Sequence, residues 1–220
     1  MEQLRAELSH LLGEKLSRME CVSEKPDSAL WSLYDSRGNP MPLMARSFTT
    51  PGLAQQLAWK ISMLARSGTV RMPVVYGVMT HEEHPGPDVL LIERLRGVPV
   101  EAPARTPERW EQLKDQIVEG LLSWHRQDSH GCVGTVDSTQ ENIWPSWYRQ
   151  RVEVLWTTLN QYQNTGLTMQ DKRLLFRTRE CLPALFEGFN DNCVLVHGSF
   201  NLRSMLKDAR SDQLLAMVGP

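Results

Sequence analysis

The sequence predicts an α+β protein with two lobes, in which a small antiparallel sheet with one inserted helix precedes a mainly helical lobe. In the first hundred residues, apolar runs of strand length alternate with turns rich in Gly and Pro, and one helical run interrupts them. Gly and Pro then cluster between residues 95 and 103, which is typical of a boundary between lobes. After residue 106 the apolar residues recur at helical spacing. We therefore expect a first lobe over residues 1–97, which includes the hinge at its end, and a second lobe over residues 98–220.

Each element of the first lobe follows from a local pattern. An N-terminal helix is predicted by leucines on one face, at Leu4, Leu8, Leu11 and Leu12, with Gly13 after it. The runs ALWSLYD and PLMARSF, separated by SRGNP, predict a β-hairpin. GLAQQLAWKISMLARSG is the inserted helix, ending at Gly68. MPVVYGVMT and DVLLIERL predict two more strands. The HEEH run at His81–His84 between them lacks the H-E-x-x-H spacing of a helical metal site, which favours a solvated hairpin tip.

The second lobe is predicted to be helical before it ends in strands. A long helix is predicted after Thr106, which is suited to its N-cap, with Pro107 in its first turn. Its apolar face carries Trp110, Leu113, Ile117, Leu121 and Trp124. Two further helices are expected over Arg149–Tyr162 and Thr168–Phe186. The apolar runs NCVLVHG and QLLAMVGP predict strands, with a turn at DARSD. The tryptophans of NIWPSWYRQRVEVLW suit packing better than a nucleobase-stacking surface in a chain of acidic balance.

The overall composition excludes several classes of protein. Hydrophobic residues make up 41% and charged residues 23% of the chain, and the formal net charge of −2 provides no general surface for nucleic acid or membrane, so we expect neither partner. No C-x-x-C pair occurs, and we expect reduced thiols at Cys21, Cys132, Cys181 and Cys193. The N-terminal helix is not signal-like and no apolar run has membrane length, so a cytoplasmic location is expected.

Four segments carry a resemblance to a known family. PVVYGVMT…GPDVLLIERLRG resembles the fourth strand, fifth strand and hinge of the aminoglycoside phosphotransferase and choline kinase-like family, and GLLSWHRQDSHG resembles its helix with a Leu-His-x-x-Asp type ending. LVHGSFNLRSML stands where that family has a His-Gly-Asp loop, and LLAMVGP where it has a metal-binding Asp turn. Within the family, the chain resembles most closely the uncharacterised YcbJ-type members. The resemblance implies a protein-kinase-like bilobal fold and phosphoryl transfer from ATP to a small-molecule hydroxyl, with Mg²⁺.

The same resemblance shows that the catalytic base is substituted. The loop Asp of the family, which accepts the hydroxyl proton, falls on Ser199, and a serine hydroxyl is no base near neutral pH. His197 is retained. We expect it to brace the loop by hydrogen bonds rather than to serve as a replacement base.

The metal positions are substituted as well. The family's loop Asn falls on Ser204 and its turn Asp on Gly219, and neither provides the carboxylate or amide oxygen that Mg²⁺ prefers. Asn201 is the one weak candidate ligand nearby. Asp208 and Asp212 are expected to be solvated residues of the turn.

The expected nucleotide site is incomplete. The resemblance assigns Arg46 to the phosphates and Glu93 and Leu95 to the hinge that binds the nucleotide. No Asp or Glu occurs between Asp35 and Glu82, so the usual acidic partner of the strand cation is absent, and a surface arginine on an edge strand is an equal alternative for Arg46. The segment SEKPDSAL also lacks the glycine that helps a loop to cover phosphates.

These substitutions predict a pseudokinase with a binding or regulatory role. The alternative is a divergent ATP-dependent small-molecule phosphotransferase. ATP and Mg²⁺ are expected as cofactors only if the family activity survives. The partners we expect are a nucleotide or another small molecule, and a protein partner or a second copy that covers the C-terminal end. Because the family continues beyond the Asp turn, we interpret the chain as a fragment, or otherwise as a natural short form capped by self-association.

Overall fold

The computed structural model describes residues 2–80, 86–129, 132–133, 140–141, 144–161, 165–189 and 193–219. The chain forms two compact units, one of residues 1–126 with 196–220 and the other of residues 127–195. These units do not divide at residue 97, and the expected lobe boundary there stays a prediction. The HEEH segment lies outside the described residues. Among the described helices, none is long and apolar enough to cross a membrane.

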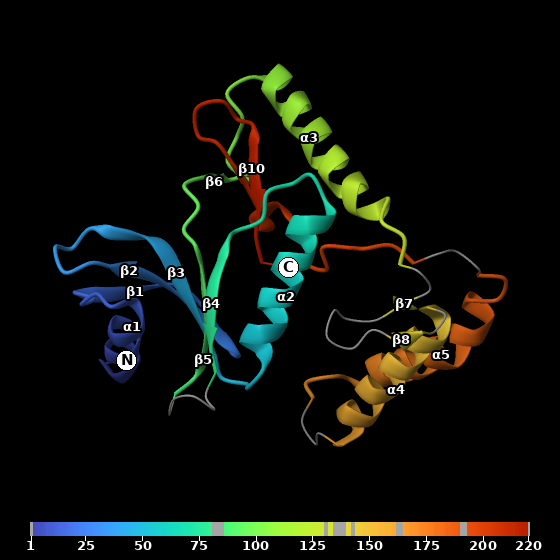
Figure 1. Cartoon of the computed structure of the whole chain (residues 1–220). Coiled ribbons are helices and arrows are strands. Elements are labelled where there is room, and N and C mark those ends of the chain that lie inside the picture. Colours follow the sequence, from blue (N-terminus) through green and yellow to red (C-terminus); the bar gives the residue numbers. More distant parts are fainter. Residues whose placement is uncertain are drawn as a thin grey trace. The chain divides into compact units, whose positions relative to one another are not determined.

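The first unit is built on a five-stranded antiparallel sheet (Figure 1). Its strands, in the spatial order β1-β2-β3-β5-β4, are β1 (Arg18–Lys25), β2 (Ser28–Tyr34), β3 (Pro40–Phe48), β5 (Asp88–Glu93) and β4 (Val75–Met79). The pattern of the sequence predicted the last four and missed β1. That strand lies at the edge, and its residues are almost all exposed, so RMECVSEK lacks the alternation that reveals a half-buried strand. Because β3 lies between β2 and β5, the alternative of an edge-strand Arg46 is wrong.

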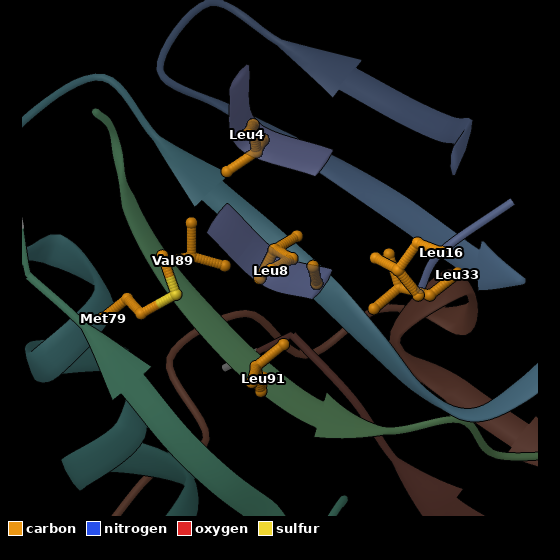
Figure 2. Close-up of a cluster of buried hydrophobic side chains, with 8 residues drawn as sticks. Leu4, Leu8, Leu16, Leu33, Met79, Val89 and Leu91 are labelled. Carbon is orange, nitrogen blue, oxygen red and sulfur yellow. The ribbon is translucent and has the colours of Figure 1, made fainter. Parts of the chain in front are cut away.

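Helix α1 (Glu2–Leu12) covers one face of this sheet, as its leucine pattern predicted. Leu4 and Leu8 are buried in a cluster of apolar side chains from the strands, among them Leu33, Val89 and Leu91 (Figure 2). These strand residues alternate with those on the opposite face, which packs against the second helix.

Helix α2 (Leu53–Ser67) contacts β3, β4 and β5 through the apolar stripe that the sequence predicted. Its N-terminus is fixed by the buried Asp88, which accepts a hydrogen bond of 2.6 Å from the backbone N–H of Gly52. The carboxylate there suits the positive end of the helix dipole. The sheet is thus enclosed between α1 and α2.

A second, three-stranded sheet joins the start of the helical region to the chain's last segment. Its order is β10-β9-β6, with β6 (Val98–Pro99), β9 (Met205–Lys207) and β10 (Leu214–Met217). The strand predicted at NCVLVHG is not formed by its described residues, of which Val194 alone pairs, in an isolated bridge with Asp128. The hairpin instead pairs β9 with β10 across the DARSD turn, since an apolar run becomes a strand only where a neighbour offers hydrogen bonds along its length.

Helix α3 (Pro107–His125) holds this hairpin through its first turns. The Thr106 hydroxyl caps it, accepting a bond of 3.3 Å from the N–H of Arg109. Asp212 of the hairpin accepts a bond of 3.0 Å from the N–H of Arg105, and its other carboxylate oxygen lies 2.8 Å from Lys207 Nζ. Asp212 is therefore no solvated turn residue, because both it and Lys207 are almost fully buried. Asp208 does form the turn, accepting bonds from the N–H groups of residues 210 and 211.

Trp124 near the end of α3 is fully buried and connects three segments of the first unit. Its indole N–H donates to the carbonyl of Leu64 in α2 at 3.0 Å. Gly68 lies so close that an added Cβ would be 2.2 Å from the indole nitrogen. The indole also stacks on the His197 ring, with 5.6 Å between the ring centroids.

The second unit consists mainly of two helices, α4 (Trp144–Gln161) and α5 (Met169–Leu185), with the short strands β7 (Cys132–Val133) and β8 (Gln140–Glu141). Helix α4 begins at Trp144 instead of the predicted Arg149, whereas α5 begins after Thr168 as predicted, with a capping box to Asp171. Trp144 packs against Tyr148, Phe186 and Phe189, and Trp156 against Phe176. These contacts agree with the prediction that the tryptophans of this segment pack within the protein instead of forming a surface for nucleobases.

Substitution of Gly68 by alanine tests the close approach to Trp124. Gly68 has an extended backbone that alanine adopts freely, so the effect is purely steric. We expect Gly68→Ala to lower the free energy of unfolding by about 1–3 kcal/mol, because the added methyl group overpacks the site. Gly77→Ala is the control, since nothing lies within 4 Å of its Cβ, and it should change stability by less than about 0.5 kcal/mol. Urea unfolding measures both, and equal effects would contradict the packing described.

The buried carboxylate of Asp212 predicts a pH dependence. Lys207, and then the backbone N–H of Arg105, lower its pKa below the usual range. A lowered pKa means that the contribution to stability is complete above about pH 4, the range of the unfolded carboxyl group, and is lost as the pH falls through the folded value. The stability difference between the wild type and Asp212→Asn should therefore shrink between pH 7 and pH 3 in urea titrations. A difference that stays constant or grows in acid would contradict this account.

Candidate functional site

The hinge, residues 94–97, follows directly after β5 and is fixed from both sides. The Glu93 N–H donates to the carbonyl of Val74 at 2.8 Å, and the Arg94 N–H to the carbonyl of Pro42 at 2.8 Å. The Glu93 carboxylate forms an ion pair with Arg71 and accepts a bond of 3.2 Å from the N–H of Val74. Glu93 thus shapes the start of the hinge and does not present a free side chain.

Leu95 differs from Glu93 in this respect. Its side chain is half-buried, and within the described part of the chain no hydrogen bond engages its peptide N–H or carbonyl. A backbone donor and acceptor therefore remain available in the hinge. Such a pair is the kind of partner that the edge of a nucleobase requires.

The hinge lies directly against the hairpin of the second sheet. An added Cβ on Gly97 would lie 2.8 Å from the Leu215 side chain and 3.1 Å from the carbonyl of Lys207. The N–H of Val100 also donates to the carbonyl of Met205 at 3.1 Å. Segments a hundred residues apart in sequence are therefore brought together on one side of the first unit.

The HG loop, residues 197–204, begins at His197. This ring is 4% exposed, and neither of its nitrogens has a hydrogen-bond partner among the described residues. Burial lowers the pKa of His197, so the neutral ring is favoured. The expected bracing by hydrogen bonds is not observed. His197 is held instead by stacking on Trp124, and Gly198 then turns the chain away with a φ of 81°.

Ser199, Asn201 and Ser204 form one local network. The Asn201 side-chain oxygen accepts from the N–H groups of Arg203 and Ser204 at 2.9 and 3.1 Å, and its amide donates to the carbonyl of Ser199 at 3.0 Å. The Ser204 hydroxyl donates to the carbonyl of Asn201 at 2.8 Å and accepts from its N–H at 3.1 Å. Together they cap a short 3₁₀ helix, η1 (Leu202–Ser204). The side-chain oxygen of Asn201, the one weak candidate for a metal ligand, is thus engaged by two backbone N–H groups.

Gly219 lies beside this network. The N–H of Val218 donates to the carbonyl of Ser204 at 2.7 Å, which brings Ser204 and Gly219, the two residues predicted to stand at the family's metal positions, to the same end of the β9–β10 hairpin. Gly219 has a φ of 67°, in the left-handed region, and an added Cβ would meet nothing within 4 Å. Among the described residues, no group of three or more His, Cys, Asp or Glu side chains is arranged to hold a metal ion.

Arg46 lies on the α2 side of the sheet and is half-buried. Its guanidinium donates to the Ser28 hydroxyl at 3.3 Å and lies 5.2 Å from the centre of the Phe48 ring. Burial lowers its pKa, while the charge of Asp27 opposes this shift, and no carboxylate among the described residues forms an ion pair with it. Helix α2 provides no acid, as its sequence indicated. No contact joins Arg46 to the hinge or the HG loop.

Sequence reasoning missed two contacts that shape this region. Trp124 was predicted as part of a helix face, but its stacking on His197 could not be expected from residues so far apart in the chain. The capping role of Asn201 had a local signal, because Asn followed three residues later by Ser resembles an N-terminal cap.

Comparisons with known proteins give relatives of high sequence identity and several distant structures. No protein-family model matches the chain. The uncharacterised protein YcbJ of Escherichia coli K12 is 86% identical over 220 residues, which are the whole of this chain and 74% of that protein, and the protein of the same name from Shigella flexneri matches equally.

The solved structures are kinases and phosphotransferases of low sequence identity. The aminoglycoside phosphotransferase APH(4)-Ia in complex with ADP and hygromycin B is 15% identical with a TM-score of 0.70, covering 98% of this chain and 70% of that one. A putative fructosamine-3-kinase from Thermobifida fusca is 19% identical with a TM-score of 0.58, covering 100% and 73%. At these identities the likeness shows the fold alone. The chain has the kinase-like fold of the aminoglycoside phosphotransferases and belongs to the family of the uncharacterised YcbJ proteins.

Proposed function

We propose that this chain is a pseudokinase, which binds a nucleotide through its hinge in a regulatory role and does not transfer phosphate efficiently. One observation carries the proposal. The side chains at the substituted metal positions either have their oxygens engaged by the backbone, as at Ser204, or have none, as at Gly219.

The absence of a base supports the same conclusion. Ser199 is exposed and carries only a hydroxyl, which keeps its proton at neutral pH. His197 is buried under the loop against Trp124 and could reach a substrate hydroxyl only if the loop opened. General-base catalysis typically contributes about 10²–10⁴ in rate, so its loss alone makes transfer slow.

The electrostatic part of the reaction is weakened in the same way. Phosphoryl transfer depends on metal ions that neutralise the charge developing on the phosphates. Asn201 could bind Mg²⁺ only after its bonds to the backbone were broken, which would leave the end of the 3₁₀ helix uncapped, and the neutral hydroxyl of Ser204 is a poor ligand for this cation. A ligand held without metal is the simpler use of this site.

Binding is supported by the groups that remain. Among the described residues, none bonds to the backbone of Leu95 and no carboxylate pairs with the Arg46 guanidinium, which can pair with phosphate. APH(4)-Ia, whose fold this chain shares, binds ADP and hygromycin B. We extend the nucleotide to this chain as part of the proposal.

The alternative, a divergent small-molecule phosphotransferase, is favoured by one feature. The HG loop and the end of β10 lie side by side, as catalysis in this family would require, since Val218 bonds to Ser204. The two functions differ in whether Mg²⁺ is used.

Thermal melting with ATP distinguishes the two functions. We expect millimolar ATP to raise the melting temperature equally with Mg²⁺ and with EDTA, and no phosphate to be transferred. ATP at about one hundred times its dissociation constant adds about 2.7 kcal/mol of stability. A shift that requires Mg²⁺, together with phosphate transfer, would establish the phosphotransferase instead. If ATP does not change the melting temperature at all, the chain does not bind this nucleotide, and both proposed functions are contradicted.

Arg46→Met tests the contact with the phosphates. If the guanidinium pairs with a phosphate, the variant should bind ATP about tenfold more weakly and adenosine as well as the wild type does. Calorimetric titration measures both ligands. Arg37→Met is the matched control, because Arg37 lies exposed in the turn before β3 and should affect neither. Equal losses for ATP and adenosine would show that Arg46 supports the fold rather than the phosphates.

A further inference from the structure

The turn between β1 and β2 brings a carboxylate close to Arg46. The Asp27 carboxylate accepts a hydrogen bond of 3.2 Å from the Ser28 hydroxyl, and the oxygen of that hydroxyl accepts one of 3.3 Å from the Arg46 guanidinium. A hydroxyl can donate one bond and accept others at the same time. Ser28 is 6% exposed, so this link between the two charged groups is shielded from water, although Asp27 itself is exposed.

The main chain fixes the position of Asp27. Its carbonyl accepts a bond of 3.0 Å from the N–H of Thr49 and one of 3.3 Å from the Thr49 hydroxyl, at the end of β3. Ser28 pairs with Phe48, which is two residues along β3 from Arg46, so Ser28 and Arg46 lie on the same face of the sheet. The carboxylate is therefore held near the guanidinium by two paired strands.

The charge of Asp27 acts on Arg46 although the two form no ion pair among the described residues. Burial lowers the pKa of Arg46, and the negative charge of Asp27 opposes this shift. Lys25, at the other end of the turn, is exposed, and no ion pair within the described part of the chain joins it to Asp27. A phosphate that approaches Arg46 therefore meets a like charge beside its partner.

We propose that Asp27 is an internal anion for Arg46, which is linked to the guanidinium through Ser28 and weakens the binding of phosphate there. This inference rests on the contact with phosphates proposed above for Arg46, and adds that the β1–β2 turn opposes it. The effect falls on the phosphates alone, because an uncharged part of a ligand is not repelled by a carboxylate. Asp27 thus determines how strongly the site selects phosphorylated ligands.

Tripolyphosphate and adenosine separate this inference from the nucleotide site as a whole. In calorimetric titrations of the 220-residue chain with EDTA at low salt, Asp27→Asn should bind tripolyphosphate about three- to fivefold more tightly than the wild type. Asparagine keeps an oxygen that can accept from the Ser28 hydroxyl and removes only the charge. The gain should shrink in about 0.5 M KCl, since salt screens exposed charges. The affinity for adenosine should not change.

Two results of these titrations would overturn the inference. The first is an Asp27→Asn variant that binds tripolyphosphate no better than the wild type. The second is that neither chain binds it up to about 10 mM. A different result concerns the hinge: if adenosine fails to bind while Asp27→Asn strengthens tripolyphosphate binding, the nucleotide proposal fails and the role of Asp27 stands.

Two further variants show whether the effect acts through Arg46. Glu24→Gln is the matched control, because it removes the same charge three residues away, and its pairing with Ala29 places it on the α1 side of the sheet, opposite to Arg46. It should leave tripolyphosphate binding unchanged. The double variant Asp27→Asn/Arg46→Met should bind tripolyphosphate no better than Arg46→Met alone.

Thermal melts without ligand confirm that each variant is folded. A gain for Glu24→Gln as large as that for Asp27→Asn would show that only the overall charge matters. A double variant that binds as tightly as Asp27→Asn would show that the guanidinium is not involved. Either result overturns the proposal.

Discussion

The indole of Trp124 donates its N–H to the carbonyl of Leu64 and lies against Gly68, so the ends of α2 and α3 are fixed to each other. The same ring supports the HG loop, because His197 stacks on it. A fully buried indole has to satisfy its single donor, and Leu64 provides the acceptor. The position of the HG loop relative to the sheet therefore depends on a contact between an aromatic ring and a glycine.

A second constraint comes from the buried charges of the hairpin. Lys207 and Asp212 are a pair with almost no exposure, and Arg105, which directly precedes the N-cap of α3, adds its N–H. A buried charge without a partner would be costly, so these groups require each other. Together with the pairing of β6 and β9, they fix the hinge beside the hairpin. This part of the kinase-like fold is therefore held by buried charges and backbone pairing.

The shape of the HG loop is fixed by hydrogen bonds within the loop itself. Asn201 and Ser204 bond to each other's backbone, so the conformation of the loop is maintained by its own short polar side chains. At Gly219 the left-handed φ suits glycine, and Asn or Asp adopts it at modest cost. The shape of this segment therefore carries no information on its chemistry, and a fold alone does not establish an activity.

Sequence patterns alone determined the helices and the strands β2 to β5 and β10, because α1, α2 and α3 bury one face each and these strands are half-buried or buried. They also predicted that Ser199, Ser204 and Gly219 stand at the positions of the family's base and metal ligands, and this assignment stays a prediction. Only the tertiary structure decided that β1 forms at an exposed edge, that β9 rather than NCVLVHG pairs with β10, and that Asp212 is buried. The reason is physical: periodicity records which side of an element faces a core, whereas pairing, stacking and buried charge depend on partners far away in the chain.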